Sequence, residues 1–381
     1  MSKSPCVQLH DLGQSVWLDN INDGLLQSGE LARLVGEGSV YGVTSNPTIF
    51  KNAIGGDKYS YPAEIARLAN AGKSPEEIYE ELAVRDIERT ADLLLETYRK
   101  GSGRDGFVSL EVRPAHAADT ASTIDEARHF WRRLNRPNLF VKVPATPEGI
   151  PAIEALIAEG VSINVTLIFG RAQYAKVAQA YRRGIERRLA AGGSLKGLHS
   201  VASVFVSRLD TSVDKELEAK AASTSTPAER ERFLDLRGAA AVANALAVWE
   251  EFRSQFFTAD FEPLRAKGAS PQWMLWASTG TKNPSYSDVK YVEELAGPDS
   301  INTMPQETLQ AFLDHGRVTG DRLTPRVETA RKTRDVLAAA GISLEAHVAK
   351  LLDEGVASFA KSYDDMMDVI RERSAALTQR R

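Results

Sequence analysis

The sequence of 381 residues predicts an α/β protein folded as a (β/α)8 TIM barrel. Short apolar strands alternate with helical segments about eight times along the chain. No linker rich in Gly, Pro or Ser interrupts this pattern, so we expect a single domain over residues 1–381. Polar side chains stand near the ends of several strands, where a barrel gathers its functional groups. A doubly wound open sheet is the alternative, but no Gly-rich dinucleotide motif follows the first strand.

Taken in order, the chain begins with two short strands separated by a helix. Residues 15–20 and 40–44 contain the Val, Trp and Tyr that favour strands. A stripe of leucines at helical spacing predicts a helix over residues 24–35. After the second strand we expect a turn, because Pro47 disfavours helical geometry at Asn46.

The next segment, residues 62–100, is predicted to be helical. Within it, Ser74 followed by Pro-Glu-Glu is typical of a helix N-terminus. A third strand at 107–112 and a helix at 122–134 follow. The fourth strand, 139–144, ends in a proline, which has no N–H to continue the ladder.

The second half of the chain repeats the alternation. A helix over 149–159 stops at Gly160, a residue type that commonly ends helices. The fifth strand over 161–167 leads into a helix that continues to residue 189. The sixth strand is expected over 200–208.

Two helical additions enlarge the predicted barrel. A mostly helical and highly charged insertion region occupies 211–257, before strands seven and eight at 273–278 and 300–304. A helical C-terminal extension covers 324–381. Its length and amphipathic pattern are compatible with a cover over the mouth of the barrel.

Composition narrows the class of function. The 47 basic and 51 acidic residues give a formal charge of −4, so nothing indicates a nucleic-acid partner. We find no signal peptide and no apolar run long enough to cross a bilayer, so a cytoplasmic protein without a membrane partner is expected. The histidines are scattered without metal-ligand spacing, and Cys6 is the single cysteine. Neither a metal site, a cofactor nor a disulfide framework is therefore predicted.

The most informative residue is Lys142, which stands within the apolar fourth strand. A strand of this kind is buried on both faces in a parallel sheet, where a lysine is costly. A lone lysine commonly lies near a strand end and extends its amine to water. A desolvated lysine, in contrast, loses its proton more readily and can attack a carbonyl group. The ends of the neighbouring strands favour this second interpretation.

Those strand ends carry polar groups that would meet Lys142 at one mouth of the barrel. They are Asp19, Asn46, Glu111, Asn164, Thr166, Ser203 and Ser278. Each has an ordinary structural explanation as well: Asp19 suits a helix cap, and Glu111 suits an ion pair with Arg113. Their joint occurrence at successive strand ends predicts an active site.

The motifs that contain these residues resemble those of the transaldolase family. In chain order they are Trp17-Leu-Asp19-Asn, Gly42-Val-Thr44-Ser-Asn46-Pro-Thr, Val108-Ser-Leu-Glu111-Val, Val141-Lys142-Val-Pro-Ala-Thr, Ile163-Asn164-Val-Thr166-Leu-Ile-Phe and Ser203-Val-Phe205-Val-Ser-Arg208. The resemblance covers roughly residues 15–315, and the helical additions resemble the longer form found in actinobacteria and their relatives. It implies a (β/α)8 barrel whose Schiff-base lysine lies on the fourth strand, where Lys142 stands.

The resemblance also implies a reaction. A dihydroxyacetone unit would pass from sedoheptulose 7-phosphate or fructose 6-phosphate to glyceraldehyde 3-phosphate or erythrose 4-phosphate, in the non-oxidative pentose phosphate pathway. Lys142 would attack the ketone, and Asp19 would take the proton of the C4 hydroxyl. Glu111 and Thr166 would hold a catalytic water. The protein would act on sugar phosphates as a monomer or homodimer.

The remaining residues that the resemblance assigns would bind the substrate. They are Thr44, Asn46, Asn164, Ser203, Phe205, Arg208, Ser278 and Lys282. Arg208 would hold the phosphate. Many transaldolases have an arginine in the seventh loop where this chain has Lys282, which can bind phosphate only as a point charge without the guanidinium fork.

Two rival functions differ from transfer. A lyase of the fructose-6-phosphate aldolase type would release dihydroxyacetone, but in those barrels the position of Phe205 tends to be tyrosine and the third-strand Glu111 is typically absent. A non-catalytic barrel that binds sugar phosphates would act as a sensor. Such a protein would require no amine nucleophile like Lys142.

Overall fold

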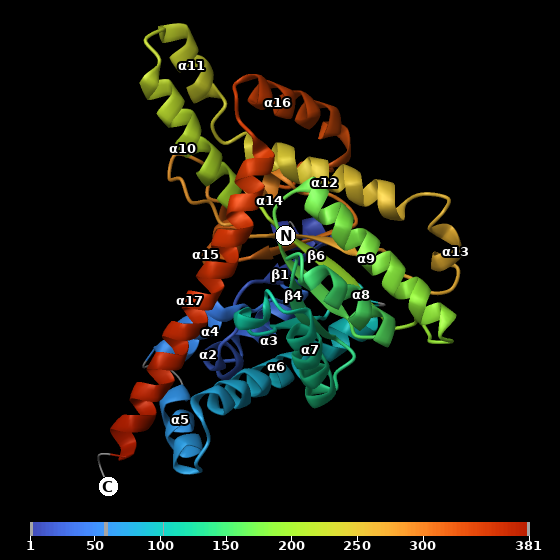
Figure 1. The fold of residues 1–381 in the computed structure, drawn as a ribbon, viewed down its shortest axis with the longest axis vertical. Coiled ribbons are helices and arrows are strands. Elements are labelled where there is room, and N and C mark those ends of the chain that lie inside the picture. The colour runs from blue at the N-terminus through green and yellow to red at the C-terminus, as the bar shows by residue number, and fades with distance from the viewer. Residues whose placement is uncertain (1–2, 57–59, 102, 379–381) are drawn as a thin grey trace.

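The computed structural model describes residues 3–56, 60–101 and 103–378. Its centre is a closed barrel of parallel strands in the order β1 to β8 (Figure 1). The strands are β1 (Gln14–Leu18), β2 (Gly42–Val43), β3 (Val108–Glu111), β4 (Leu139–Pro144), β5 (Ile163–Ile168), β6 (Ser200–Phe205), β7 (Trp273–Ala277) and β8 (Ser300–Met304). Because β1 pairs in parallel with both β2 and β8, the sheet has no edge and the open-sheet alternative is wrong. The predicted (β/α)8 barrel is confirmed.

Helices surround the barrel and follow its strands. In the first half they are α1 (Pro5–Leu12), α2 (Asp23–Gln27), α3 (Glu30–Gly36), α4 (Pro47–Gly55), α5 (Tyr61–Asn70), α6 (Pro75–Lys100), the 3-10 helix η1 (Pro114–His116), α7 (Thr120–Leu134), α8 (Gly149–Glu159) and α9 (Arg171–Ala190). In the second half they are α10 (Ser207–Ser223), α11 (Pro227–Asp235), α12 (Ala240–Phe256), α13 (Glu262–Arg265), α14 (Lys290–Glu294), α15 (Gln306–His315), the 3-10 helix η2 (Thr324–Arg326), α16 (Val327–Ala339) and α17 (Leu344–Thr378). Among these described helices none is long and apolar enough to cross a membrane.

An aromatic layer fills the barrel interior and forms the floor of its carboxyl-terminal mouth. Trp17 lies on β1, Phe107 directly precedes β3, and Phe140 lies on β4. Their ring centroids are 4.3 to 6.3 Å apart. Side chains alternate between the two faces of a strand, so the residues two positions further on also point inward. On β1 and β4 those residues are Asp19 and Lys142. The hydrophobic core thus stops where the polar site begins.

Several predicted helices and strands have different bounds in the structure. The helix expected over 24–35 is divided at Gly29, whose φ is 77°, and the segment 62–100 is divided at Gly72, whose φ is 80°. Periodicity misses these breaks because the apolar spacing continues across them. A capping box at Ser74 begins α6 as expected. The helices α1, α4, α13, α14 and α15 were not predicted.

The sixth strand is shorter than predicted, and this moves Arg208 into a helix. The strand β6 ends at Phe205, and α10 begins at Ser207. Asp210 lies in the first turn of α10, where a carboxylate stabilises the helix N-terminus. Its Oδ1 also accepts the backbone N–H of Ala241, 2.7 Å away. These contacts favour an early helix start over a longer strand.

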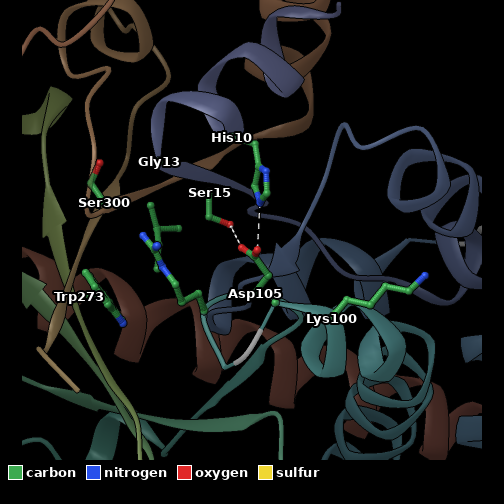
Figure 2. Close-up of a pocket in the computed structure, with 10 residues that line it drawn as sticks. His10, Gly13, Ser15, Lys100, Asp105, Trp273 and Ser300 are labelled. Carbon is green, nitrogen blue, oxygen red and sulfur yellow. Dashed lines mark hydrogen bonds and ion pairs between the residues drawn. The ribbon is translucent and has the colours of Figure 1, made fainter. Parts of the chain in front are cut away.

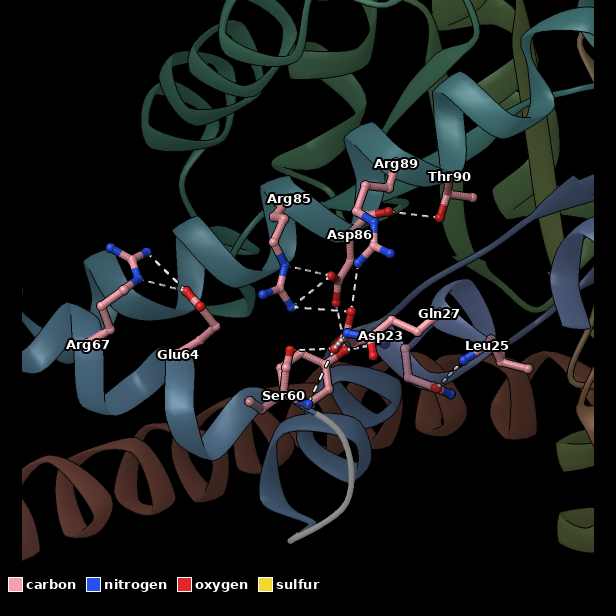
Figure 3. Close-up of polar contacts among 12 residues, drawn as sticks. Asp23, Leu25, Gln27, Ser60, Glu64, Arg67, Arg85, Asp86, Arg89 and Thr90 are labelled. Carbon is pink, nitrogen blue, oxygen red and sulfur yellow. Dashed lines mark hydrogen bonds and ion pairs between the residues drawn. The ribbon is translucent and has the colours of Figure 1, made fainter. Parts of the chain in front are cut away.

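A buried carboxylate network joins α2, α5 and α6 at the side of the barrel (Figure 3). Asp23 is fully buried and accepts from Arg89 Nη1 at 2.6 Å and from Ser60 Oγ. Tyr61 Oη donates to Asp86 Oδ2 at 2.6 Å. Burial alone would raise the pKa of Asp23, but the bonds from Ser60 and Arg89 hold it below its usual range. The network fixes the helices that follow β1 and precede β3.

The two helical additions have different environments. The hairpin of α10 and α11 projects from the body, and α11 has no buried residue (Figure 1). In contrast, α12 is buried along most of its length between α9 and α16. The long helix α17 packs along α4, α5, α6 and α10. Two of these helices, α4 and α10, begin just after the carboxyl ends of β2 and β6, so α17 lies beside the mouth.

Candidate active site

The barrel brings the predicted polar residues to its carboxyl-terminal end. Asp19 and Thr44 directly follow β1 and β2, Glu111 ends β3, and Lys142 and Thr166 lie near the ends of β4 and β5. The other predicted residues on this end are Asn46, Asn164, Ser203, Phe205, Arg208, Ser278 and Lys282. Parallel strands place all their carboxyl ends at the same rim, which is why separate motifs form one site.

Lys142 is buried and has two close partners. Its side chain is only 5% exposed, and Nζ donates to the backbone carbonyl of Ser45 at 2.9 Å. The same nitrogen lies 3.1 Å from Glu111 Oε2. Burial raises the pKa of Glu111, while the Lys142 ammonium opposes that rise. The pair is therefore arranged so that a proton can move between amine and carboxylate.

Asp19 belongs to a second polar group, which it forms with Thr44 at the next strand end. Its Oδ1 accepts from Thr44 Oγ1 at 2.6 Å. Burial raises the pKa of Asp19 above its usual value. The charges of Lys142, Lys282 and Arg208 and the bond from Thr44 act against that rise. A carboxylate with a raised pKa is suited to accept and return a proton near neutral pH.

Asn164 is held between two serine hydroxyls. Its Nδ2 donates to Ser109 Oγ at 3.0 Å, and its Oδ1 accepts from Ser203 Oγ at 2.7 Å. Both ends of the amide are bonded, so the Asn164 side chain is held in place between the two serines. Thr166 Oγ1 is buried and has no hydrogen-bond partner among the described residues. It remains available to a small polar molecule in the site.

Asn46 has a structural role as well as a place at the rim. Its Oδ1 accepts the backbone N–H of Ile49 at 3.0 Å and caps α4. The carbonyl oxygen is therefore committed to the helix. The side-chain amide nitrogen is the group through which Asn46 can meet a substrate hydroxyl.

Two cations border the mouth on the side of α10 and the seventh loop. The Arg208 guanidinium lies 5.3 Å from the ring centroid of Phe205 and is half-buried. Burial lowers the pKa of Arg208, and the charges of Glu354 and Asp19 counteract this. Lys282 is exposed to solvent. An anionic group would thus meet one half-buried cation and one exposed cation.

Backbone strain occurs at two places on the same rim. Leu167 has a φ of 58° and Ser278 a φ of 54°, values that are uncommon outside glycine. Leu167 follows Thr166, and Ser278 Oγ lies 3.1 Å from Ser207 Oγ at the start of α10. Such strain persists where the surrounding structure imposes it, often at functional sites.

The C-terminal extension lies at this end of the barrel. Ser362 and Asp365 of α17 bond Thr48 and Lys51 of α4 at 2.9 and 2.7 Å. Nearer the start of α17, Gly355 faces the Leu167 side chain so closely that a Cβ there would lie 3.0 Å from it. The extension therefore supports the loops that carry the site residues.

A cavity of about 320 Å³ opens at the opposite end of the barrel (Figure 2). It is lined by residues at the amino-terminal ends of strands, such as Ser15 and Trp273. Asp105 there accepts from Ser15 Oγ at 2.5 Å and lies 3.0 Å from His10 Nε2. These polar groups bond one another, and the aromatic layer separates them from Lys142. The cavity is not part of the candidate site.

Three residues of the site were missed by the sequence reasoning. The carbonyl of Ser45 receives the Lys142 amine, Ser109 bonds Asn164, and Thr303 bonds Thr44. Strand period would have revealed Ser109, which is two residues before Glu111 on the same inward face. Thr303 is a polar residue near the end of the predicted eighth strand, and the same feature identified the other site residues. A backbone carbonyl such as that of Ser45 leaves no signal in the sequence.

The arrangement supports nucleophilic chemistry at a carbonyl group. A buried amine lies beside one carboxylate and faces a second, and hydroxyl and amide groups surround them. Among the described residues no group of His, Cys, Asp and Glu side chains is arranged to hold a metal ion.

Comparisons with known proteins agree with this chemistry. Residues 16–370 match the family described as transaldolase/fructose-6-phosphate aldolase. A transaldolase of Thermobifida fusca is 45% identical over 98% of this chain and 100% of its own length. Transaldolases of Saccharopolyspora erythraea and Thiobacillus denitrificans are 44% and 45% identical, and cover 96% and 93% of this chain and 96% of their own lengths.

Proposed function

The chain belongs to the transaldolase/fructose-6-phosphate aldolase family and is a transaldolase, and we propose that it transfers a dihydroxyacetone unit through a Schiff base on Lys142. The observation that carries this proposal is the position of the Lys142 amine, buried in the mouth and 3.1 Å from Glu111. The donors are sedoheptulose 7-phosphate and fructose 6-phosphate. The acceptors are glyceraldehyde 3-phosphate and erythrose 4-phosphate, as in the non-oxidative pentose phosphate pathway.

The first step forms the covalent bond to the donor. Lys142 gives its extra proton to Glu111, whose raised pKa makes it a competent base, and the free amine attacks C2 of the ketose. The resulting carbinolamine loses its hydroxyl as water to form the iminium ion. Glu111 and Thr166 lie on the strands that flank β4, and together they hold the water that carries protons in this step.

The second step cleaves the carbon–carbon bond. Asp19 takes the proton of the C4 hydroxyl, the C3–C4 bond breaks, and its electron pair moves into the iminium. The aldose phosphate leaves, and the three-carbon fragment stays on Lys142 as an enamine. In the reverse direction the enamine attacks the carbonyl carbon of the acceptor, and Asp19 returns the proton to the new hydroxyl. Hydrolysis then releases the product ketose.

The rim residues hold the substrate during these steps. Asn46, Asn164 and Ser203 bind the hydroxyls of the three-carbon fragment, and Thr44 lies beside them. Retaining the fragment until an acceptor arrives requires such fixed hydrogen bonds. The phosphate lies against Arg208, Lys282 and Ser278, with the Phe205 ring as the adjoining wall.

We also propose the location, oligomeric state and domain organisation of the enzyme. The chain acts in the cytoplasm as a monomer or homodimer. Residues 1–381 form one barrel domain, with 211–257 as an insertion region and 324–381 as an extension. Size-exclusion chromatography with light scattering measures the oligomeric state, and a mass above that of a dimer would contradict it.

Borohydride trapping tests the covalent step. The wild-type enzyme is incubated with fructose 6-phosphate, reduced, digested and mapped by mass spectrometry. We expect a reduced three-carbon adduct on Lys142, and none in Lys142→Met. The matched variant Lys73→Met removes a lysine that pairs with Glu81 outside the mouth, and it should still be trapped. A folded wild-type enzyme without the adduct would contradict the Schiff base.

The acceptor then separates transfer from release. Adding erythrose 4-phosphate before reduction should discharge the adduct into sedoheptulose 7-phosphate. A lyase would instead release free dihydroxyacetone at the same rate with or without the acceptor. That result would favour the fructose-6-phosphate aldolase type of reaction.

A further inference from the structure

A chain of hydroxyl groups continues from Asp19 to the last strand of the barrel. Thr44 Oγ1 lies 2.6 Å from Asp19 Oδ1, and Thr303 Oγ1 lies 2.6 Å from Thr44 Oγ1. Thr44 and Thr303 are each only 2% exposed, so water does not compete freely for these bonds. None of the roles proposed above uses Thr303.

We propose that Thr303 is a positioning residue that orients the Thr44 hydroxyl toward Asp19 and supports both protonation states of that carboxyl group. The inference rests on the proposed role of Asp19 as the base that takes and returns the C4 hydroxyl proton. It assigns Thr303 no contact with the substrate.

Counting protons explains why two hydroxyls are needed. A hydroxyl has one proton to donate, and an ionised carboxylate can only accept. When Asp19 is ionised, the Thr44 hydroxyl donates its hydrogen bond to the carboxylate, so Thr303 must donate to the Thr44 oxygen. When Asp19 holds the proton from C4, it can donate to Thr44, which then donates to Thr303. The same atoms form a complete chain in both states.

The backbone holds this chain in register. Thr303 pairs with Trp17 across the junction of β8 and β1, and the N–H of Asp19 donates to the carbonyl of Met304 at 2.8 Å. The N–H of Thr44 donates to the Leu18 carbonyl at 2.9 Å. The three side chains therefore come from three adjacent strand ends whose spacing is set by the barrel ladder. Groups on rigid elements keep such geometry more closely than groups on loops.

Other charged groups that face Asp19 must be considered in any pH measurement. They are Lys142 on β4, Glu111 on β3, Arg208 on α10 and Lys282 in the loop after β7. All four are unchanged when only Thr303 is altered. A shift of the pH profile in a Thr303 variant therefore reports on the hydroxyl chain.

The test is Thr303→Val, which keeps the shape of the side chain and removes the hydroxyl. We expect kcat to fall on the order of tenfold, since a hydrogen bond to a charged group contributes that much and here acts through a second hydroxyl. The acid limb of the kcat profile should move to higher pH, because ionised Asp19 loses polarising support. KM should change less than kcat, and borohydride trapping of the donor on Lys142 should persist. Thr303→Ser should restore both kcat and the pH profile.

Thr90→Val is the matched control. Thr90 is a fully buried threonine of α6 whose hydroxyl bonds the Asp86 carbonyl at 2.8 Å, away from the mouth. It should leave kcat and the pH profile unchanged. If Thr303→Val has the wild-type pH profile and kcat while the wild type is trapped on Lys142, the inference is wrong and the proposed function stands. If the wild type itself is not trapped, the proposed function fails first.

Discussion

Lys142 Nζ lies 3.1 Å from Glu111 Oε2 inside the barrel, and each side chain is only 5% exposed. Few charged pairs in a protein are so completely removed from water, and such a pair is costly to break from one side. The pair therefore affects the stability of the protein as well as its chemistry.

The first prediction concerns this pair. Lys142→Met should abolish turnover and also destabilise the protein by roughly 3 kcal/mol at neutral pH, because it leaves the Glu111 carboxyl buried without its partner. Adding Glu111→Gln should recover most of that loss while activity stays absent. Urea unfolding of both single variants and the double variant measures the coupling. Additive losses in the double variant would show that the pair is not coupled.

The second prediction concerns Asp19 and pH. Burial raises the pKa of Asp19 in the folded state, so its ionisation weakens folding: this loss develops as pH rises from the unfolded pKa of about 3.9 through the folded pKa. Asp19→Asn should therefore unfold at a higher temperature than wild type at pH 7, and the gain should shrink below about pH 4. Carbon–carbon cleavage should be lost, while trapping of the donor on Lys142 persists. Loss of trapping would assign Asp19 a different role.

The third prediction separates the two cations at the rim. Arg208→Gln should raise KM for phosphorylated substrates by roughly 10- to 100-fold, because a half-buried guanidinium beside Phe205 is an oriented partner for phosphate. Lys282→Gln should raise KM much less, since Lys282 is exposed. Arg230→Gln on the exposed helix α11 is the control and should leave KM unchanged. A larger effect at Lys282 would reverse the assignment.

The fourth prediction concerns His199, which lies at the other end of the barrel from Lys142. Burial lowers the pKa of His199 to about 4, and its Nδ1 has no partner among the described residues. A histidine with a depressed folded pKa destabilises the fold as pH falls from the unfolded value of about 6.5 toward 4. The loss should reach roughly 3 kcal/mol, and His199→Phe should remove it.

Urea unfolding at pH 7 and pH 4.5 measures this difference. His129→Gln alters an exposed histidine that pairs with Glu80, and it should keep the wild-type pH dependence. An unchanged pH dependence in His199→Phe would locate the titrating group elsewhere.

The fifth prediction concerns the C-terminal extension. Phe359 of α17 is 3% exposed and lines a small cavity with Glu111 and Leu167. Phe359→Ala should lower the free energy of unfolding by about 3 kcal/mol or more, the range for a large aromatic side chain in a core. Val336→Ala on α16 alters an exposed side chain and should change stability by less than about 0.5 kcal/mol. A loss below 1 kcal/mol at Phe359 would mean that α17 packs only loosely on the barrel.

Much of the barrel could be predicted from local patterns. Each strand is a short apolar run that can be recognised from the residues within it. The sequence therefore predicts the regions of all eight strands. The helix breaks at Gly29 and Gly72 were missed because apolar spacing continues through them. The early start of α10 was missed because it depends on Asp210 bonding a residue thirty-one positions away.

The sequence by itself determined the fold class, the residues at the strand ends and, through Lys142 and its motifs, the kind of chemistry. These are local properties: strand period and residue type are present in every short segment. Only the tertiary structure decided that Ser45 offers its carbonyl to Lys142 and that Thr303 bonds Thr44. Closing the barrel joins β8 to β1 and brings residues 259 positions apart to within 2.6 Å, a proximity no local pattern encodes.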